Sequence, residues 1–593
     1  MEKTRFGDVA IATLSFLELS DDILHYILDF ISLQSDFNNI CSTSKRLQAL
    51  ATPRLYRKII INVNEQHEVE CFIAGMFLGG SSNLKYTRSL TLTDNILPHE
   101  PSIPSSERLY FNPSFGAIIE PASWEPLINS ESPETDLELA RSMYLLINLF
   151  PKNCLETFRY LSLFAPNRSA MSTLYDNHSQ SLKHLHISVG DAEYTQLFDK
   201  VRTLDLVMTH HEGDLRKVMN LLKNTLNNPN LERLCIANLS YYYMSTLYSA
   251  LTQGPGGPRK FNDTLKELTI NGIEVNEPKF TAGLLQSINL DFLTRLTLWD
   301  CLRTKDLDRL TSNYSAANPI KLKHFAFSWR MEDNINARNL NDAAMQCNQP
   351  LHSFLILCTS LESLCLKWHG ISDVTLVRDA IIQIGSNLRL LSLHYKDFEA
   401  NQNPRFSTLK SSDLAIVCER CPKLQQLGFQ MRGLDQIELL AKLDDGPHPL
   451  DTISRLRDLR VLHLRHTFEE PISLRQQHIA TLRTFHLQQI ADFIFRWIFK
   501  AGSKSRLEAL AIGQKMLPPR PQDEAVYHHY TPLHCYLRTD QTTYHGIPSV
   551  KGTLVESYLL RSENPYTEIL DWNSNWHKNC KWMYRIPGRF HDD

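Results

Sequence analysis

The sequence predicts an α/β solenoid in which short parallel strands form one curved sheet and helices cover its convex side. The first observation is a recurring Leu-x-x-Leu-x-Leu pattern, found unchanged in residues 361–366, 388–393 and 459–464. The second is its repetition, since about a dozen copies stand roughly 20 to 40 residues apart, the spacing of a repeat array. The copies begin at Leu182, Val201, Leu231, Leu265, Leu293, Leu322, Leu361, Leu388, Leu424, Leu459, Leu482 and Leu507. The third is the period of 2 between the last two apolar residues of each copy, which is typical of a short strand.

Composition narrows the classes of protein that the chain can belong to. Its 593 residues are 42% hydrophobic and 21% charged, and no run approaches the roughly 20 apolar residues that span a bilayer, so we expect no membrane association. The N-terminus does not resemble a secretory signal, and 12 cysteines are too few to staple a fold of this size. We therefore expect reduced thiols and a cytoplasmic or nuclear location. A pI near 6.8 makes nucleic acid an unexpected partner.

A small helical module is predicted for residues 13–56, after an N-terminal tail over residues 1–12. Ser20 is a good N-cap, and Asp21 and Asp22 place negative charge in the first turn, where the helix dipole favours it. Aliphatic side chains then follow in one wide stripe. The stripe contains Ile23, Leu24, Ile27, Leu28 and Ile31. A module of this size buries little core by itself, so the stripe is suited to packing against another surface.

This module resembles an F-box. The matching positions are Leu19, Asp22, Ile23, Leu24, Ile27, Leu28, Asp36, Phe37, Cys41, Ser44, Lys45, Arg46 and Leu47. Two positions depart from the family pattern, because Ser20 stands where Pro is usual and Asp22 where Glu is usual. An F-box followed by leucine-rich repeats resembles the fungal type of F-box leucine-rich-repeat protein. The resemblance implies an α/β leucine-rich-repeat solenoid with a small N-terminal all-α F-box. It also implies the role of substrate receptor in a Skp/cullin/F-box E3 ubiquitin ligase.

In that interpretation the module binds a Skp-type adaptor and, through it, a cullin. The adaptor-binding residues would be Leu19, Ser20, Ile23, Leu24, Ile27, Leu28 and Ile31. A second interpretation stays open, in which the helices only cap the first repeat of the solenoid. A third is a repeat scaffold that binds protein partners without any connection to a ligase.

The solenoid is expected over residues 57–515, with first strands at 59–61 and 88–92. Prolines interrupt it with an inserted loop over 94–134. Further expected elements are a helix at 137–150, convex-side helices at 214–226 and 412–421, and a glycine-rich surface loop at 254–260. Residues 516–593 are expected to form an aromatic cap over the last strand. The aromatic residues of this tail are Trp572, Trp576, Trp582 and Tyr584.

No motif indicates catalysis, a metal site or a cofactor. Cys418 and Cys421 have no second cysteine pair at zinc-finger spacing, so we interpret them as buried structural thiols. The clustered histidines have no third ligand at a recognisable spacing. They are His184, His186, His210, His211, His528 and His529. The chain is therefore predicted to be non-catalytic. In the ligase interpretation it contributes by holding a bound substrate close to the subunits that transfer ubiquitin.

The repeat register predicts the concave face, because residues between the consensus leucines point away from the core. In this register the first half of the face is small and neutral, and the second half is basic and rich in histidine. We hypothesise that an acidic or phosphorylated segment of a protein substrate binds there. The residues concerned are Trp299, Lys367, His394, His463, Arg465 and His486. The alternative is an ordinary solvated face of mixed charge.

Overall fold

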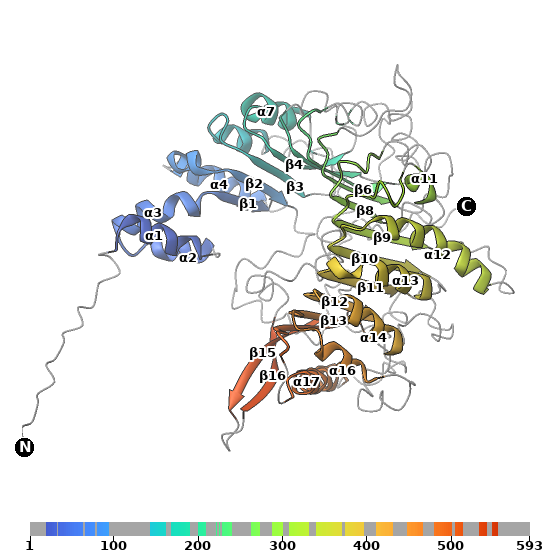
Figure 1. The fold of residues 1–593 in the computed structure, drawn as a ribbon. Coiled ribbons are helices and arrows are strands. Elements are labelled where there is room, and N and C mark those ends of the chain that lie inside the picture. The colour runs from blue at the N-terminus through green and yellow to red at the C-terminus, as the bar shows by residue number, and fades with distance from the viewer. Residues whose placement is uncertain are drawn as a thin grey trace, which may run out of the picture.

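A sheet of sixteen strands, ordered as in the sequence, runs through the described part of the computed structural model (Figure 1). Strands β1 to β14 pair in parallel, β15 and β16 pair antiparallel, and the sheet is open at both ends. In Figure 1 the strands follow an arc with helices on its outer side, while α1–α3 lie at the N-terminal end. The predicted α/β class with one long parallel sheet is confirmed. The structure describes residues 19–31, 34–62, 66–77, 80–93, 143–161, 166, 168–189, 200–208, 221, 225, 228–239, 263–272, 288–299, 307–312, 314–330, 340–369, 374–396, 411–430, 447–465, 479–500, 504–513, 533–542 and 548–555.

Most strands are short, as expected for units that each add one strand to the sheet. The strands are β1 Lys58–Asn62, β2 Ser89–Thr93, β3 Thr157–Leu161, β4 His184–Val189, β5 Thr203–Met208, β6 Arg233–Leu239, β7 Glu267–Gly272, β8 Arg295–Trp299, β9 His324–Arg330, β10 Ser363–His369, β11 Leu390–Lys396, β12 Gln426–Gln430, β13 Val461–Arg465, β14 Ala509–Ile512, β15 His534–Thr542 and β16 Pro548–Val555. The helices are α1 Asp21–Asp29, α2 Gln34–Cys41, α3 Lys45–Leu55, α4 Gln66–Phe77, α7 Arg168–His178, α11 Leu307–Thr311, α12 Leu340–Leu357, α13 Val374–Ile384, α14 Ser411–Arg420, α16 Pro449–Ser454 and α17 Ile479–Ile498, with 3-10 turns η2 Gly80–Tyr86 and η7 Gly385–Asn387.

The main core lies between the sheet and the helices, and the consensus leucines fill it. In β10, Leu364 and Leu366 are fully buried on the helix side, while the residues between them face the concave side. Aromatic side chains take the same positions in β9, where the ring centroid of Phe325 lies 4.6 Å from that of Phe354 in α12. The expected strands at 59–61 and 88–92 are present as β1 and β2, and the expected helix at 412–421 is α14.

The copy of the pattern that begins at Leu482 was predicted to be a strand, and this prediction is wrong. Residues 482–487 lie within the helix α17. The buried side chains of α17 are spaced at three and four residues, which is the period of one helix face. They are Leu487, Ile490, Ala491, Ile494, Phe495 and Ile498. Leucines at positions 1, 4 and 6 fit a helix as well as a strand, and here the longer helical pattern determines the structure.

The C-terminal edge of the parallel sheet is covered by the hairpin of β15 and β16. Side chains of α17 then bind the backbone of β16: the amide of Gly552 donates to Asp492 Oδ1 at 2.9 Å, and its carbonyl accepts from Gln488 Nε2 at 2.7 Å. These hydrogen bonds satisfy backbone polar groups that would have no partner at an uncovered sheet edge. The tail aromatics at 572–584 lie outside the described residues.

Several other sequence predictions fall only partly within the described residues. The proline-rich stretch at 94–134 and the glycine-rich stretch at 254–260 lie outside them. Of the helix expected at 137–150, residues 143–149 are described and are helical. Only two residues of the expected helix at 214–226 are described, Leu221 and Thr225, and both are helical and buried.

Gly385 offers a test of the packing between the η7 turn and the end of α14. A Cβ atom at this position would lie 2.5 Å from Cys421 Sγ and 3.0 Å from the Arg420 carbonyl oxygen. Gly385→Ala is therefore expected to lower the free energy of unfolding by about 1 to 3 kcal/mol, the usual cost of overpacking. Urea unfolding checks this expectation. The control is Gly75→Ala in α4, where nothing lies within 4 Å and alanine is expected to stabilise the helix. Equal effects of the two substitutions would contradict the packing account.

Candidate interaction site

Helix α1 begins where the sequence predicts. The Ser20 side chain caps it by accepting from the Ile23 amide at 3.4 Å, and Asp21 and Asp22 lie in its first turn. Two ion pairs tie α1 to α3, because Arg46 Nη2 lies 2.6 Å from Asp21 Oδ1 and Arg54 makes the same contact with Asp29 at 2.6 Å. The backbone carbonyl of Leu19 also accepts from Arg46 Nη2. Contacts at both ends of α1 thus orient this helix relative to α3.

One face of α1 forms the small core of the N-terminal module. Leu24 and Leu28 are buried, and Leu28 packs with Phe37 of α2 and Ala51 of α3. The predicted stripe is therefore divided, since these two leucines face inward and Ile27 and Ile31 are half-buried. The prediction that all five residues of the stripe form one adaptor-facing surface needs correction. A three-helix module has to bury some of its own leucines to hold together.

The opposite face of α1 is apolar and exposed. Ile23, Tyr26 and Phe30 are 47%, 66% and 71% exposed, and they follow one another at i, i+3 and i+7. The rings of Tyr26 and Phe30 meet edge to face with centroids 4.9 Å apart. We call these three residues the aromatic face of α1. The predicted stripe included Ile23 but neither aromatic residue, although their spacing of four is a signal for a shared helix face.

The concave side of the sheet is charged in its N-terminal half. His186 Nδ1 lies 3.4 Å from Asp205 Oδ2, and Arg233 Nε lies 3.9 Å from both Asp205 Oδ1 and Glu267 Oε2. The row of charged side chains extends to β8, where Arg295 Nε lies 3.8 Å from Glu267 Oε1. Burial alone would raise the pKa of Asp205, but the hydrogen bond to His186 and the charges of nearby arginines hold it below its usual value.

The prediction that this half is small and neutral is therefore wrong. The predicted rows left out the first residue of each strand, which also points to the concave side. In β6, β7 and β8 this residue is Arg233, Glu267 and Arg295. The carboxylate of Asp205 lies beside His186, a contact that the spacing of the two residues in the sequence does not indicate. Cross-strand register supplies this contact, because His186 and Asp205 are directly paired between β4 and β5.

The C-terminal half of the concave side is buried, which corrects the prediction of an exposed basic surface. Trp299 and His394 are buried, and His463 and Arg465 are each only 2% exposed. Among the residues predicted to bind substrate that lie on strands, Lys367 is the one that is partly exposed. Around them lies a second apolar cluster, separate from the main core. Its buried members are Trp299, Ala326, Cys365, Leu390, Val461, Ala509, Ala511 and Cys535.

His486 does not join these residues, because it lies in helix α17 and is half-buried there. His463, in contrast, is held in one orientation: its Nε2 lies 2.7 Å from the Gly513 carbonyl oxygen. Since a carbonyl only accepts, Nε2 carries the proton and Nδ1 is bare. Burial, together with the charge of Arg465, lowers the pKa of His463 to about 3, so the ring is neutral at physiological pH.

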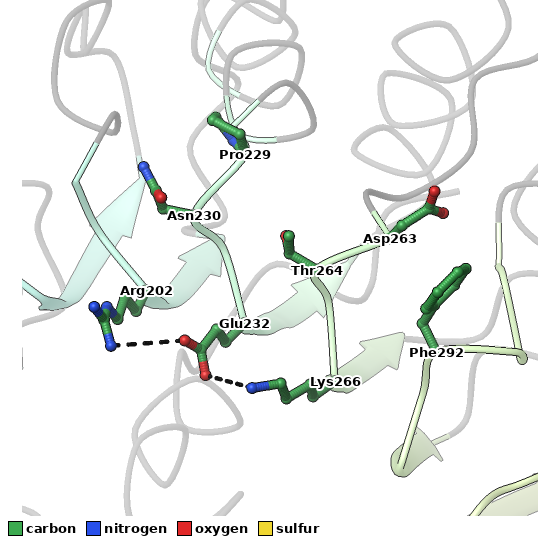
Figure 2. Close-up of a pocket in the computed structure, with 8 residues that line it drawn as sticks. All are labelled: Arg202, Pro229, Asn230, Glu232, Asp263, Thr264, Lys266 and Phe292. Atoms are coloured by element: carbon green, nitrogen blue, oxygen red, sulfur yellow. Dashed lines mark hydrogen bonds and ion pairs between the residues drawn. The ribbon is translucent and has the colours of Figure 1, made fainter.

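A hollow of about 310 Å³ lies at the edge of the sheet, where the strands begin (Figure 2). Its charges are already paired, as Glu232 contacts Arg202 at 3.8 Å and Lys266 at 3.1 Å. Asp263 accepts from the Asn289 side chain at 3.1 Å. We therefore interpret the hollow as a product of the ion pairs between residues that precede neighbouring strands. Its lining residues are Arg202, Pro229, Asn230, Glu232, Asp263, Thr264, Lys266 and Phe292.

Cys418 and Cys421 are buried, as predicted. Burial raises the pKa of each thiol to about 12, so both stay protonated and are poor metal ligands. Across the described ranges no three His, Cys, Asp or Glu side chains are grouped as a metal site would require. His184 is exposed at the start of β4, while the histidines at 210, 211, 528 and 529 lie outside the described residues.

Comparison with known proteins adds no family to this picture. No protein-family model matches the chain, and no curated protein shows significant similarity to it. None of the helices in the described part of the chain has the length and apolarity needed to cross a membrane. The described residues therefore define an α/β protein with one long, mostly parallel, open sheet, an exposed aromatic face on α1, and a concave side that is charged in one half and buried in the other.

Proposed function

We propose that the chain is an F-box leucine-rich-repeat protein that serves as the substrate-recognition subunit of a Skp/cullin/F-box E3 ubiquitin ligase. Helices α1 to α3 bind a Skp-type adaptor, which connects to a cullin, and the parallel sheet binds a protein substrate. The chain itself is non-catalytic and needs no cofactor, because the ubiquitin chemistry belongs to other subunits. This function operates in the cytoplasm or the nucleus.

The aromatic face of α1 is the observation that carries the proposal. A helix that only caps a solenoid is expected to be apolar inward and polar outward. Helix α1 is instead apolar on both sides, with Leu24 and Leu28 inside and Tyr26 and Phe30 exposed outside. Burying three large apolar side chains is worth roughly 5 to 9 kcal/mol before the costs of association. The ordered F-box pattern in the sequence supports a Skp-type adaptor as the partner.

The exposed part of the concave face supports the second half of the proposal. Its N-terminal half presents charged groups from adjacent strands, including the exposed Arg159 and Arg233. Lys367 adds a partly exposed cation further along the sheet. Side chains on paired strands are well placed to recognise a partner, because a backbone that is already ordered loses little conformational entropy on binding.

Affinity purification with mass spectrometry tests the proposed function. Wild type is expected to recover an adaptor and a cullin, and Ile23→Asp, on the aromatic face, is expected to lose both. The matched control is Ile416→Asp, which charges an exposed isoleucine on α14 and should leave recovery unchanged. Recovery of other partners without an adaptor would instead identify a repeat scaffold with no connection to a ligase.

A further inference from the structure

A row of mostly charged residues follows the edge of the sheet at which the strands begin. Backbone hydrogen bonds of 2.8 Å join the residues directly before β9 to β14, as in the bond from the Glu362 amide to the Lys323 carbonyl. Figure 2 shows the same edge nearer the N-terminus, before β5 to β7. Neighbouring strands lie about 4.8 Å apart, so the row extends over about 24 Å. Its members are Lys323, Glu362, Arg389, Gln425, Arg460 and Glu508.

The connections that lead into β9 to β14 carry far more positive than negative side chains. They contain ten Lys or Arg and three Asp or Glu, although the net charge of the whole chain is -3. A local excess of one sign attracts a partner of the opposite sign even when the whole protein is close to neutral. We call these connections the basic edge. They are residues 312–323, 358–362, 385–389, 421–425, 455–460 and 499–508.

The excess begins at β9 and does not extend along the whole sheet. Directly before β6 to β8, the described residues contain one Lys and three acids. These residues are 228–232, 263–266 and 288–294. The basic edge is therefore a bounded surface on the C-terminal half of the protein.

The three acids of the basic edge are already ion-paired within it. Glu362 is shared, because its Oε1 lies 3.2 Å from Lys323 Nζ and its Oε2 lies 4.0 Å from Arg389 Nε. The other pairs are Asp458 with Arg506 and Glu508 with Arg460. These pairs use the acids of the edge but leave several of its cations over.

Lys321, Lys423 and Arg457 are exposed cations of the basic edge. Within the described part of the chain, no carboxylate lies within ion-pair distance of these three side chains. Lys423 Nζ donates to Asn387 Oδ1 at 3.2 Å, and this amide oxygen is neutral. A negative partner therefore reaches these cations without breaking an existing ion pair. Each exposed contact contributes little alone, so the partner has to engage several of them together.

The composition of the basic edge favours an acidic polypeptide over a nucleic acid. Carboxylates of Glu362 and Glu508 stand within the row and repel a continuous line of phosphates. Single-stranded nucleic acid also relies on stacking against aromatic side chains, whereas none of the six residues directly before β9 to β14 is aromatic. A peptide can place its carboxylates opposite the lone cations alone. At about 3.3 Å per residue, an extended peptide covers the row with about seven residues.

We propose that the basic edge binds an extended acidic segment of a partner protein, about seven residues long. Lys321, Lys423 and Arg457 provide its principal contacts. The edge is separate from the aromatic face of α1 and from the concave side of the sheet, so this binding does not depend on the proposed ligase function.

Fluorescence anisotropy of the full chain with a labelled octaglutamate peptide tests the site. Wild type is expected to bind the peptide saturably, with a Kd below about 100 μM in a low-salt buffer. Binding is expected to weaken at least about tenfold at about 0.5 M salt, because salt screens exposed charges. Lys321→Glu/Lys423→Glu is expected to weaken binding at least about tenfold at low salt, since two attractive charges become repulsive.

The matched control is Lys45→Glu/Arg168→Glu, which makes the same change in net charge at exposed positions on α3 and α7. Its Kd is expected to stay within about twofold of wild type, because these positions are not on the basic edge. No binding of octaglutamate to wild type, or an equal loss in the two double variants, would overturn the site. Binding of octaglutamine as tight as that of octaglutamate would do the same.

Two further measurements keep the proposal testable. Should Lys321→Glu/Lys423→Glu fail to fold, Lys321→Gln/Lys423→Gln removes the charges without reversing them, and its Kd is expected to rise at least about threefold. An unchanged Kd in that variant would contradict the proposal. A single-stranded DNA octamer is titrated in parallel. Tighter binding of the octamer than of octaglutamate, lost in the same double variant, would make the edge a nucleic-acid surface and refute the acidic peptide.

Discussion

Truncation of both aromatic residues of α1, in the double variant Tyr26→Ala/Phe30→Ala, is expected to weaken adaptor binding by roughly 100-fold or more. The two rings are 66% and 71% exposed, so they make few contacts that the free protein would lose. Exposed aromatic residues at the centre of an interface commonly contribute 2 kcal/mol or more each when truncated. Because Leu24 and Leu28 are buried on the opposite side of α1 and are not changed, we expect the helices to remain folded. Calorimetric titration with purified adaptor measures the change.

The control for this variant is Phe292→Ala. Phe292 is also an exposed aromatic residue, but it lies at the hollow where the strands begin, just before β8 and so distant from α1 along the strand order. Adaptor affinity is expected to be unchanged in this control. If the double variant binds as tightly as wild type, the aromatic face is not the docking surface and the assignment of α1 to the adaptor fails.

Phe325→Ala is expected to cause the largest loss of stability among these variants, about 3 to 5 kcal/mol. The Phe325 ring is fully buried between β9 and α12, stacks at 5.9 Å from Phe327 and lies 4.6 Å from Phe354. Removing it leaves a cavity that rigid neighbours on both sides cannot close. Because each strand pairs only with its neighbours in the sequence, the region around β9 is expected to open first. Hydrogen exchange of residues 324–330 and urea unfolding together measure this effect.

Phe292→Ala again provides the comparison, because it removes the same side chain from an exposed position. It is expected to change the free energy of unfolding by less than about 0.5 kcal/mol. Similar losses in the two variants would show that the sheet and the helices do not share the core described for β9 and α12.

The parallel sheet could be predicted from sequence because its determinants are local. Each strand needs only two apolar residues at period 2, and Leu364 and Leu366 occupy the core as expected. The exception at Leu482 has the same spacing, but Ile490, Ile494 and Ile498 extend it into a helical pattern. A short motif could not decide between the two structures, whereas a window of about twenty residues favours the helix.

Exposure on the concave side could not be predicted from the same register. The register correctly assigns His463 and Arg465 to that side, but it does not show that both are buried. Burial depends on packing between segments far apart in the sequence. Likewise, Arg465 of β13 reaches Ser392 of β11 at 3.1 Å, across the intervening strand β12. The strand register therefore gives the position of Arg465 but not its burial.

The outer face of α1 was also only partly predictable. The sequence predicts an amphipathic helix with a single apolar stripe, whereas Ile23 and Phe30 lie on a second apolar face opposite Leu28. The difference arises because the small module uses two leucines for its own core. An apolar residue count cannot separate an internal face from an exposed one.

Titration of the full chain with a purified Skp-type adaptor tests the central claim most directly. The account predicts a saturable complex with a Kd at or below about 1 μM, which corresponds to about 8 kcal/mol of binding free energy. The complex should be lost when Ile23 is replaced by Asp. Absence of any complex at tens of micromolar, with the chain folded, would contradict the proposal that this protein is a ligase receptor.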